Sequence, residues 1–183
     1  NSFGIDFDPI TGMLWDTENG PDFGDEVNLV EPGFNSGWKK VQGIWYVDAA
    51  MGKSDVATMN PSELVDFNSK GKYSSPEFTW DRSVAPTALE FLNTNKLGLE
   101  YENDILVGDI KSGNIYIFNL SENRKSLDLN EPLDDKVADK KEELSSIIFG
   151  HGFGGITDLE VGPDGYLYVL AYDKEDGRIY RVH

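Results

Sequence analysis

Short strand–turn–strand units recur along this chain and constrain its fold more than any other feature. In residues 3–15, apolar and polar side chains alternate, turn formers follow at residues 9–12, and an extended run then resumes. The same order recurs over residues 104–120 and 157–170, and residues 177–182 form one more candidate strand. Alternation with a period of two is typical of half-buried strands, and Gly, Pro, Asn and Asp mark the turns between them. The chain is therefore predicted to be all-β.

The repetition of these units favours a β-propeller, in which each small antiparallel sheet packs against its neighbours. Each blade takes on the order of 45 residues, so the chain would supply about three blades. Propellers have about four blades or more because the ring must close, and open sheet edges invite pairing. Residues 1–183 are therefore predicted to be one portion of a larger ring. Its open side would be covered by more of the same chain or by self-association with a second copy.

Two segments interrupt the repeats and are interpreted as long inserts, roughly residues 47–79 and 121–143. The first is rich in Ser, Lys and Asp. The second contains helix-favouring Lys, Glu and Ala around residues 134–144, but no apolar stripe that would dock a helix. It is predicted to be a loop with one helical turn.

Composition excludes several classes of function. The 16 basic and 33 acidic residues give a formal charge of −17, which would repel a nucleic-acid backbone or an anionic membrane surface. The absence of cysteine excludes disulfides, thiolate catalysis and cysteine-ligated metal sites. No apolar run approaches the roughly 18 residues that suggest a membrane span. Neither nucleic acid nor a membrane is expected as a partner.

One acidic segment, residues 17–29, combines turn formers with side-chain oxygens. Gly20, Pro21 and Gly24 interrupt a regular strand or helix, so the backbone must bend and turn carbonyls inward. Three carboxylates lie close by: Asp22, Asp25 and Glu26. Carbonyl and carboxylate oxygens are the ligands that calcium takes in groups of six to eight. The segment is either a calcium loop or an acidic surface turn between strands, and spacing alone leaves both open.

The same segment carries a family resemblance. Residues 17–29 (TENGPDFGDEVNL) and 32–38 (PGFNSGW) resemble the signature of the soluble quinoprotein glucose/sorbosone dehydrogenases, the aldose sugar dehydrogenase family. The resemblance covers essentially the whole chain and implies the C-terminal half of a six-bladed propeller. It also implies pyrroloquinoline quinone (PQQ) and Ca²⁺ as cofactors, and a sugar that loses a hydride from its anomeric carbon to the quinone. The catalytic histidine would lie in the other half, so no catalytic residue is predicted here.

The resemblance assigns metal ligands to this segment. The carbonyls of Gly20 and Pro21 correspond to ligands of the calcium that binds the cofactor, and neutral carbonyl oxygens suit a calcium beside an anionic quinone. Glu26 and the Ser36 carbonyl match a second, structural calcium site. The alternative for all four is an ordinary turn.

Four residues are predicted to contact the cofactor. Lys111 resembles the family's quinone-binding lysine and would stabilise a developing oxyanion, although a solvated turn lysine fits the same position. Trp80 and Ser83 belong to a segment similar to the strand entry that lines the cofactor pocket, but Trp80 is equally an ordinary core residue. Asn1 opens the Asn-x-x-Gly motif that an arginine usually precedes in the family.

The chain departs from the family at Gly155 and Thr157, where arginines commonly pair with the cofactor carboxylates. Neither residue supplies a guanidinium fork. Residues 150–155 formally match G-x-G-x-x-G, but a strand rather than a helix follows, so a dinucleotide loop is rejected. His151 in this segment is interpreted as a loop histidine.

The sequence therefore predicts part of a PQQ-dependent sugar dehydrogenase that is inactive as the 183-residue chain alone. By resemblance, the intact protein would be extracellular or periplasmic and would act on a sugar. The alternative is a non-catalytic, calcium-stabilised propeller that binds a protein or a glycan.

Overall fold

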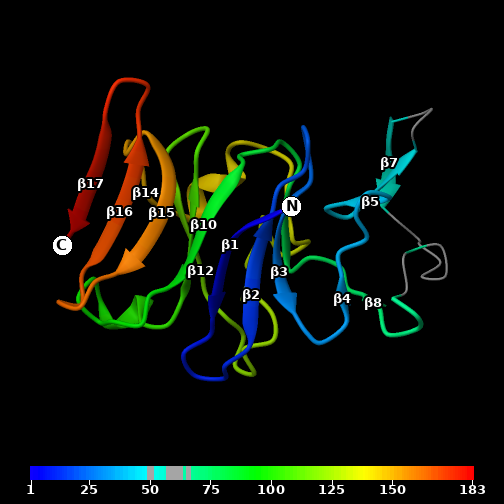
Figure 1. The fold of residues 1–183 in the computed structure, drawn as a ribbon, viewed down its shortest axis with the longest axis horizontal. Coiled ribbons are helices and arrows are strands. Elements are labelled where there is room, and N and C mark those ends of the chain that lie inside the picture. Colours follow the sequence, from blue (N-terminus) through cyan, green and yellow to red (C-terminus); the bar gives the residue numbers. More distant parts are fainter. Residues whose placement is uncertain (49–51, 57–63, 65–66) are drawn as a thin grey trace.

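The computed structural model describes residues 1–48, 52–56, 64 and 67–183. Its regular structure consists of β-strands and two short 3-10 helices, η2 (Leu99–Tyr101) and η3 (Glu143–Ser146). The strands form five separate sheets, none of which closes on itself among the described residues (Figure 1). The all-β prediction is confirmed.

The first sheet has five strands in the order β1-β2-β3-β9-β13. They are β1 (Ser2–Phe7), β2 (Leu14–Glu18), β3 (Asp25–Val30), β9 (Phe78–Trp80) and β13 (Val137–Ala138). The first four pair antiparallel, and β13 joins β9 in parallel. The second predicted insert is thus more than a loop, because it supplies this edge strand, and its helical turn forms at η3.

The second and third sheets continue the pattern. The second has the order β10 (Pro86–Phe91), β11 (Ile105–Asp109), β12 (Ile115–Phe118) and β14 (Ile148–Gly150). The third has the order β15 (Gly155–Val161), β16 (Leu167–Tyr172) and β17 (Gly177–Val182). The three predicted strand–turn–strand units are confirmed as the antiparallel pairs β1–β2, β11–β12 and β15–β16.

Two small sheets lie to one side of the first sheet (Figure 1). They pair β4 (Phe34–Asn35) with β8 (Lys72–Tyr73), and β5 (Val41–Gln42) with β6 (Trp45–Asp48) and β7 (Gly52–Val56). The first predicted insert, residues 47–79, begins in β6 and ends in β9, and part of it lies outside the described residues.

The second sheet is buried on both faces. All five residues of β11 are buried. Ile105 and Val107 pack in a cluster with Trp15 and Phe78 of the first sheet. Leu106 packs on the opposite side, in a cluster with Ile156 of the third sheet. Because alternate strand residues point to opposite faces, the apolar residues 105–107 of this strand join the two cores.

Carboxylates tie the first strands of successive sheets together. Asp6 on β1 accepts a hydrogen bond from the backbone N–H of Phe91 on β10, at 2.8 Å. Glu90 on β10 accepts one from the N–H of Val161 on β15, at 3.0 Å. Gly4 on β1 lies against Ala88 and Leu89 of β10, and the Thr87 hydroxyl on β10 donates to the Ile156 carbonyl of β15. With the carboxylate contacts further along each strand, these contacts show that β1, β10 and β15 run in the same direction.

Replacing Glu90 by glutamine is expected to make the protein more stable at alkaline pH. Burial, with repulsion from nearby carboxylates, raises the pKa of Glu90 from 4.5 to about 7. Between pH 4.5 and about pH 7, the folded state therefore holds a proton on Glu90 that the unfolded state has lost. The free energy of unfolding falls as the pH rises through this range. The shift corresponds to an upper limit of about 3.4 kcal/mol, and partial exposure reduces this to about 1–2 kcal/mol.

Thermal unfolding of Glu90→Gln and the parent from pH 5 to pH 8 measures this effect. The glutamine Oε1 can still accept from Val161, so the two proteins should differ little at pH 5 and most at pH 8. The matched control is Glu175→Gln, an exposed carboxylate in the turn between β16 and β17, at the opposite end of the third sheet from Val161. Parallel pH profiles of the parent and Glu90→Gln would contradict the prediction.

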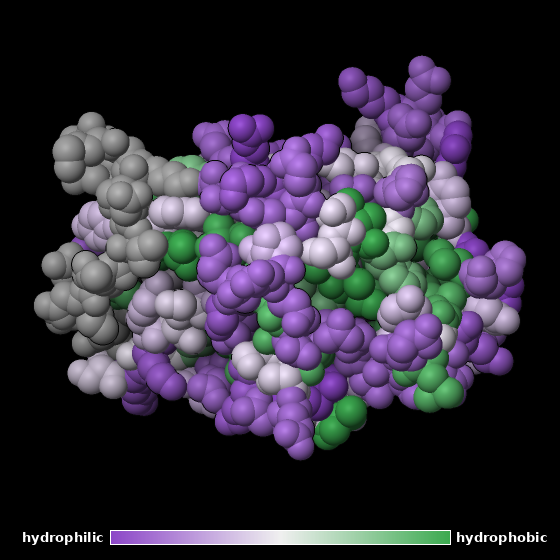
Figure 2. Space-filling view, turned by 180° about the vertical axis from the view of Figure 1, so that it is seen from behind, coloured by the Kyte–Doolittle hydropathy of each residue, from purple (hydrophilic) through white to green (hydrophobic). Residues whose placement is uncertain are grey.

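Hydrophilic side chains cover most of the rear face, and hydrophobic ones gather on the half away from the grey residues (Figure 2). Among the described residues, no helix is long and apolar enough to cross a membrane.

Candidate functional site

The predicted cofactor-binding residues gather at one end of the first and second sheets. Because β1 and β10 run in the same direction, Asn1 and Ser83, which precede them, lie at the same end. The turns after β2 and β11 also lie there, since these strands are antiparallel to β1 and β10. Asn1 is paired with the loop after β2, since its backbone carbonyl accepts from the N–H of Asn19 at 3.1 Å. Gly20 and Pro21 follow directly.

Asp25 joins this loop to the entry of β10. Its Oδ1 accepts from the N–H of Gly20 at 2.9 Å, and its Oδ2 accepts from the N–H groups of Val84 and Ala85, each at 2.7 Å. Asp25 is completely buried, and this burial raises its pKa although the donated hydrogen bonds act in the opposite direction. One carboxylate thus sets the spacing between the two loops.

Lys111 reaches the same entry segment from the β11–β12 turn. Its Nζ donates to the backbone carbonyl of Ser83 at 3.0 Å, and its side chain is exposed. The turn is held by buried Asp109, whose Oδ1 accepts from the N–H of Gly113 at 3.1 Å and whose Oδ2 accepts from the hydroxyl of Tyr116 at 2.9 Å. The cation therefore sits on an ordered turn beside the loop of Gly20.

Trp80 lies in the core rather than at the surface of this site. Its side chain is 1 % exposed and packs against Phe78 and Tyr116, with ring centroids 4.9 and 5.3 Å apart. Its backbone carbonyl accepts from the N–H of Gly24 at 3.0 Å. Trp80 thus contacts the loop through its backbone while its indole lies in the core, in agreement with the core alternative, and stacking on a cofactor stays a prediction.

Glu26 and Ser36 lie in a second, more buried group of acids. Glu26 is paired across the strands with Glu18, and the Ser36 hydroxyl donates to Glu18 at 3.0 Å. Glu26 accepts from the N–H of Gly43 at 2.6 Å and from the side-chain amide of Asn28 at 3.1 Å. Burial, followed by repulsion from Glu18, raises the pKa of Glu26 well above its ordinary value.

Several buried acceptors beside Glu26 lack a hydrogen-bond donor. These are Asp16 Oδ1, Asn19 Oδ1, Asn28 Oδ1 and Gln42 Oε1. Asp16 and Asn28 face each other across β2 and β3, next to the Glu18–Glu26 pair. In the described part of the chain, no three acidic or histidine side chains converge as a ready metal cluster. The oxygens present nevertheless fit a calcium held by mixed carboxylate, amide and carbonyl ligands.

The two positions that depart from the family offer no anion-binding group. Gly155 begins β15 so close to Ile110 that a Cβ there would lie 2.9 Å from the Ile110 carbonyl oxygen. An arginine would require the backbone to move. The Thr157 hydroxyl donates to the carbonyl of Leu170 at 3.2 Å. Lys111, which contacts Ser83, is thus one cation that the structure brings to this end of the sheets, and Arg82 directly precedes Ser83 there.

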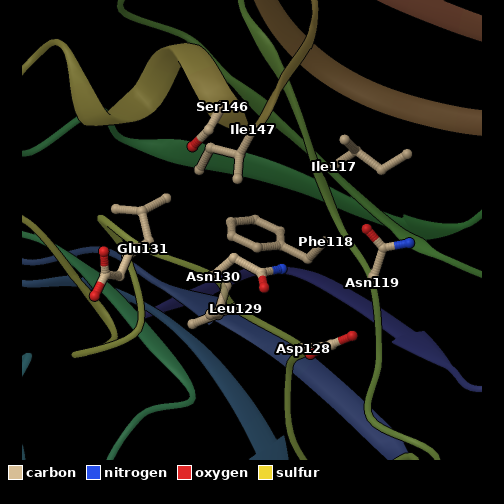
Figure 3. Close-up of a pocket in the computed structure, with 10 residues that line it drawn as sticks. Ile117, Phe118, Asn119, Asp128, Leu129, Asn130, Glu131, Ser146 and Ile147 are labelled. Atoms are coloured by element: carbon tan, nitrogen blue, oxygen red, sulfur yellow. The ribbon is translucent and has the colours of Figure 1, made fainter.

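A cavity of about 120 Å³ lies at the opposite end of β12 from Lys111 (Figure 3). Phe118 and Ile147 contribute its apolar lining, and the exposed carboxylates of Asp128 and Glu131 lie on its rim. No lysine or arginine of the described chain lines it. It is therefore unsuited to an anionic cofactor.

Sequence reasoning missed the residues that organise the site. Asp25 was considered only as one of three carboxylates that could ligate calcium, and Asp109 received no role. An aspartate flanked by turn glycines was the available signal for both. Asn28 and Gln42 could be found only in three dimensions, because their unsatisfied oxygens meet Glu26 through pairing between separate strands.

Comparison with known proteins agrees with this fold and site. A sequence profile of the Glucose / Sorbosone dehydrogenase family matches residues 1–181. Aldose sugar dehydrogenase YliI of Escherichia coli (strain K12) is 28 % identical over 182 residues, covering 100 % of this chain and 41 % of that protein.

Two solved structures show the same fold. The soluble aldose sugar dehydrogenase of Escherichia coli in its apo form gives a TM-score of 0.64 at 25 % identity, covering 99 % of this chain and 44 % of that one. The PQQ-bound form of the aldose sugar dehydrogenase from Streptomyces coelicolor gives 0.59 at 16 % identity, covering 99 % and 42 %.

The small antiparallel sheets and these two likenesses place the chain in the fold class of those dehydrogenases. With the profile matched over nearly its full length, the chain belongs to the Glucose / Sorbosone dehydrogenase family. It spans less than half the length of the relatives it matches.

Proposed function

We propose that this chain forms about three blades of a six-bladed propeller in a PQQ-dependent sugar dehydrogenase. The observation that carries the proposal is the junction at Asp25, which places the Gly20–Pro21 loop against the segment that Lys111 contacts. Family membership supports a sugar substrate. An extracellular or periplasmic location belongs to the same proposal.

The exposed ends of the structure support a larger ring. Phe3, Ile5 and Phe7 on β1 are about 60 % exposed, on the face turned away from β10. Glu160 occupies the position on β15 that Asp6 and Glu90 occupy on β1 and β10, and no described residue donates to it. More of the same chain would cover both ends. Self-association is the alternative, and light scattering on this chain at high concentration separates a monomer from a dimer.

The chain's own residues would position the cofactor and the metal. When bound, PQQ would supply a quinone that accepts a hydride from the sugar. Lys111 would hold a positive charge beside the developing negative charge, with its Nζ kept in place by the Ser83 carbonyl. The carbonyls of Gly20 and Pro21 would hold calcium, and Asn1 lies against the same loop. The proton-accepting histidine would come from outside this chain.

Titrating the intact protein with PQQ in the presence of calcium tests this proposal. A saturable change in quinone absorbance and sugar-dependent turnover are expected. Lys111→Gln should lower turnover about 100-fold, because one preorganised charge at a transition state is worth roughly 3 kcal/mol. Lys174→Gln, an exposed turn lysine, is the matched control. If no saturable change occurs although calcium still stabilises the protein, the non-catalytic binding propeller is the better description.

Calcium is expected to raise the midpoint of thermal unfolding. Without a cation, the raised pKa of Glu26 means that stability falls as the pH rises through that pKa; a bound calcium would reverse this trend. At 100 times the dissociation constant the gain is about 2.7 kcal/mol. Glu26→Gln should abolish most of it, whereas Glu31→Gln, at an exposed ion pair, should keep it. An equal calcium response in both variants would contradict the assignment of Glu26.

A further inference from the structure

Arg82 lines a cavity that adjoins the proposed cofactor site. The volume of this cavity is about 530 Å³, within the range of small-molecule sites. Trp80 and Ser83, which are predicted to contact the cofactor, line it as well, together with Ser112, the residue after Lys111. Arg82 is exposed and directly precedes Ser83 in the chain. It is therefore placed to reach a ligand bound at that site.

The backbone beside Arg82 is fixed by hydrogen bonds. The Ser83 carbonyl accepts from Lys111 Nζ at 3.0 Å, and the Ser83 N–H donates to the carbonyl of Asp22 at 3.2 Å. The next two N–H groups along the chain donate to buried Asp25, each at 2.7 Å. A side chain that starts from a fixed backbone loses less conformational freedom when it binds a ligand. This order favours Arg82 as a binding group.

The charges around the cavity select no anion by their sum. Residues 138–144 contribute one part of the lining and carry two lysines and three carboxylates. Arg82 brings this total to zero, and Lys111 raises it to +1. Both cations lie beside Ser83, and neither forms an ion pair with a carboxylate that the structure describes. Both therefore remain available to an anionic cofactor.

We propose that Arg82 binds a carboxylate of PQQ and supplies the guanidinium that is absent at Gly155 and Thr157. This inference rests on the proposed function. The planar guanidinium offers two parallel N–H groups that match a carboxylate, whereas the Lys111 ammonium is a point charge that suits a single quinone oxygen. Held at two different groups, the flat ring system would have one orientation at the site. Arg82 would then set the affinity for the cofactor.

Titration of the intact protein with PQQ and with its trimethyl ester, both in the presence of calcium, tests this inference. The ester keeps the quinone and the ring system but has no carboxylate. Arg82→Gln should weaken PQQ binding at least tenfold, the scale of a hydrogen-bonded contact to a charged group, and should weaken ester binding less than twofold. The PQQ affinity of Arg82→Lys should lie between those of the parent and Arg82→Gln, because lysine keeps the charge but has no planar fork.

Arg178→Gln is the matched control. Arg178 is an exposed arginine on β17 that does not line the cavity, so its replacement should leave the PQQ affinity unchanged. A folding defect in Arg82→Gln would weaken both ligands alike. Equal losses for PQQ and the ester, or an unchanged PQQ affinity in Arg82→Gln while the parent binds PQQ saturably, would overturn this inference alone. A parent without saturable PQQ binding would overturn the proposed function and this inference together.

Discussion

Replacing Arg124 by alanine is expected to lower the free energy of unfolding by about 3–5 kcal/mol, the range for breaking a buried ion pair. The guanidinium binds Asp8 with both prongs, Nε to Oδ2 and Nη2 to Oδ1, each at 2.8 Å. The Asp8 side chain is fully buried and that of Arg124 is 15 % exposed. Loss of the arginine would leave an unpaired carboxylate beneath the β1–β2 turn.

The pair also fastens the segment of residues 121–143 to the first sheet. Arg124 Nη2 donates to the carbonyl of Asn103 at 2.8 Å, and the guanidinium carbon lies 5.9 Å from the centre of the Phe91 ring. Truncation therefore removes packing as well as charge. Burial raises the pKa of Asp8, but hydrogen bonds led by that from Arg124 outweigh it, so the pKa is lowered. The stability from this pair is present above the unfolded-state pKa and is lost as the pH falls.

Urea unfolding at neutral pH measures this loss. Lys72→Ala is the matched control, because its 3.4 Å pair with Glu31 is exposed, and such pairs contribute about 0–1 kcal/mol. Arg124→Met combined with Asp8→Asn should be less damaging than Arg124→Ala, since it leaves no buried charge. A loss below about 1 kcal/mol for Arg124→Ala would show that water reaches Asp8.

Replacing Asp25 by alanine is expected to cost about 3 kcal/mol or more and to abolish cofactor binding. Three backbone N–H groups would lose their acceptor, and each unsatisfied buried group costs about 1–3 kcal/mol. Ala85 also has a φ of 55°, a strained conformation for a residue with a Cβ. Without Asp25, this segment and the Gly20 loop would lose the carboxylate that binds both, and would keep only backbone contacts such as that from the Ser83 N–H to the Asp22 carbonyl at 3.2 Å.

Unfolding and PQQ titration of the same variant separate stability from positioning. Asp22→Ala removes an exposed neighbouring carboxylate and should change stability by less than about 0.5 kcal/mol. The stability and the PQQ affinity of Asp25→Asn, which retains one carbonyl oxygen, should lie between those of Asp25→Ala and Asp22→Ala. If Asp25→Ala behaves like Asp22→Ala in both measurements, the loops are held by other contacts.

Much of the fold could be predicted because its signals are local. Apolar–polar alternation within residues 3–8 and 157–161 and the apolar run of residues 105–107 mark the strands, and the glycine-containing turns separate the strands of each unit. Alternation did not specify which side of β1 is buried, because its apolar side chains at Phe3, Ile5 and Phe7 are exposed. The structure confirms all three units. Edge strand β13 was missed, because two residues paired in parallel with a strand far back in the chain leave no periodic signal.

The candidate site was predictable only in part, for the same reason. The sequence by itself determined the short strands, the acidic calcium-like loop and the residue types offered for cofactor binding, since these follow from spacing and from motifs within about twenty residues. Only the tertiary structure decided that Lys111 contacts Ser83, that Asp25 binds Val84, 59 residues further along the chain, and that Trp80 is buried. Hydrogen bonding and burial between distant segments depend on how whole sheets pack, and no local pattern of side chains specifies that packing.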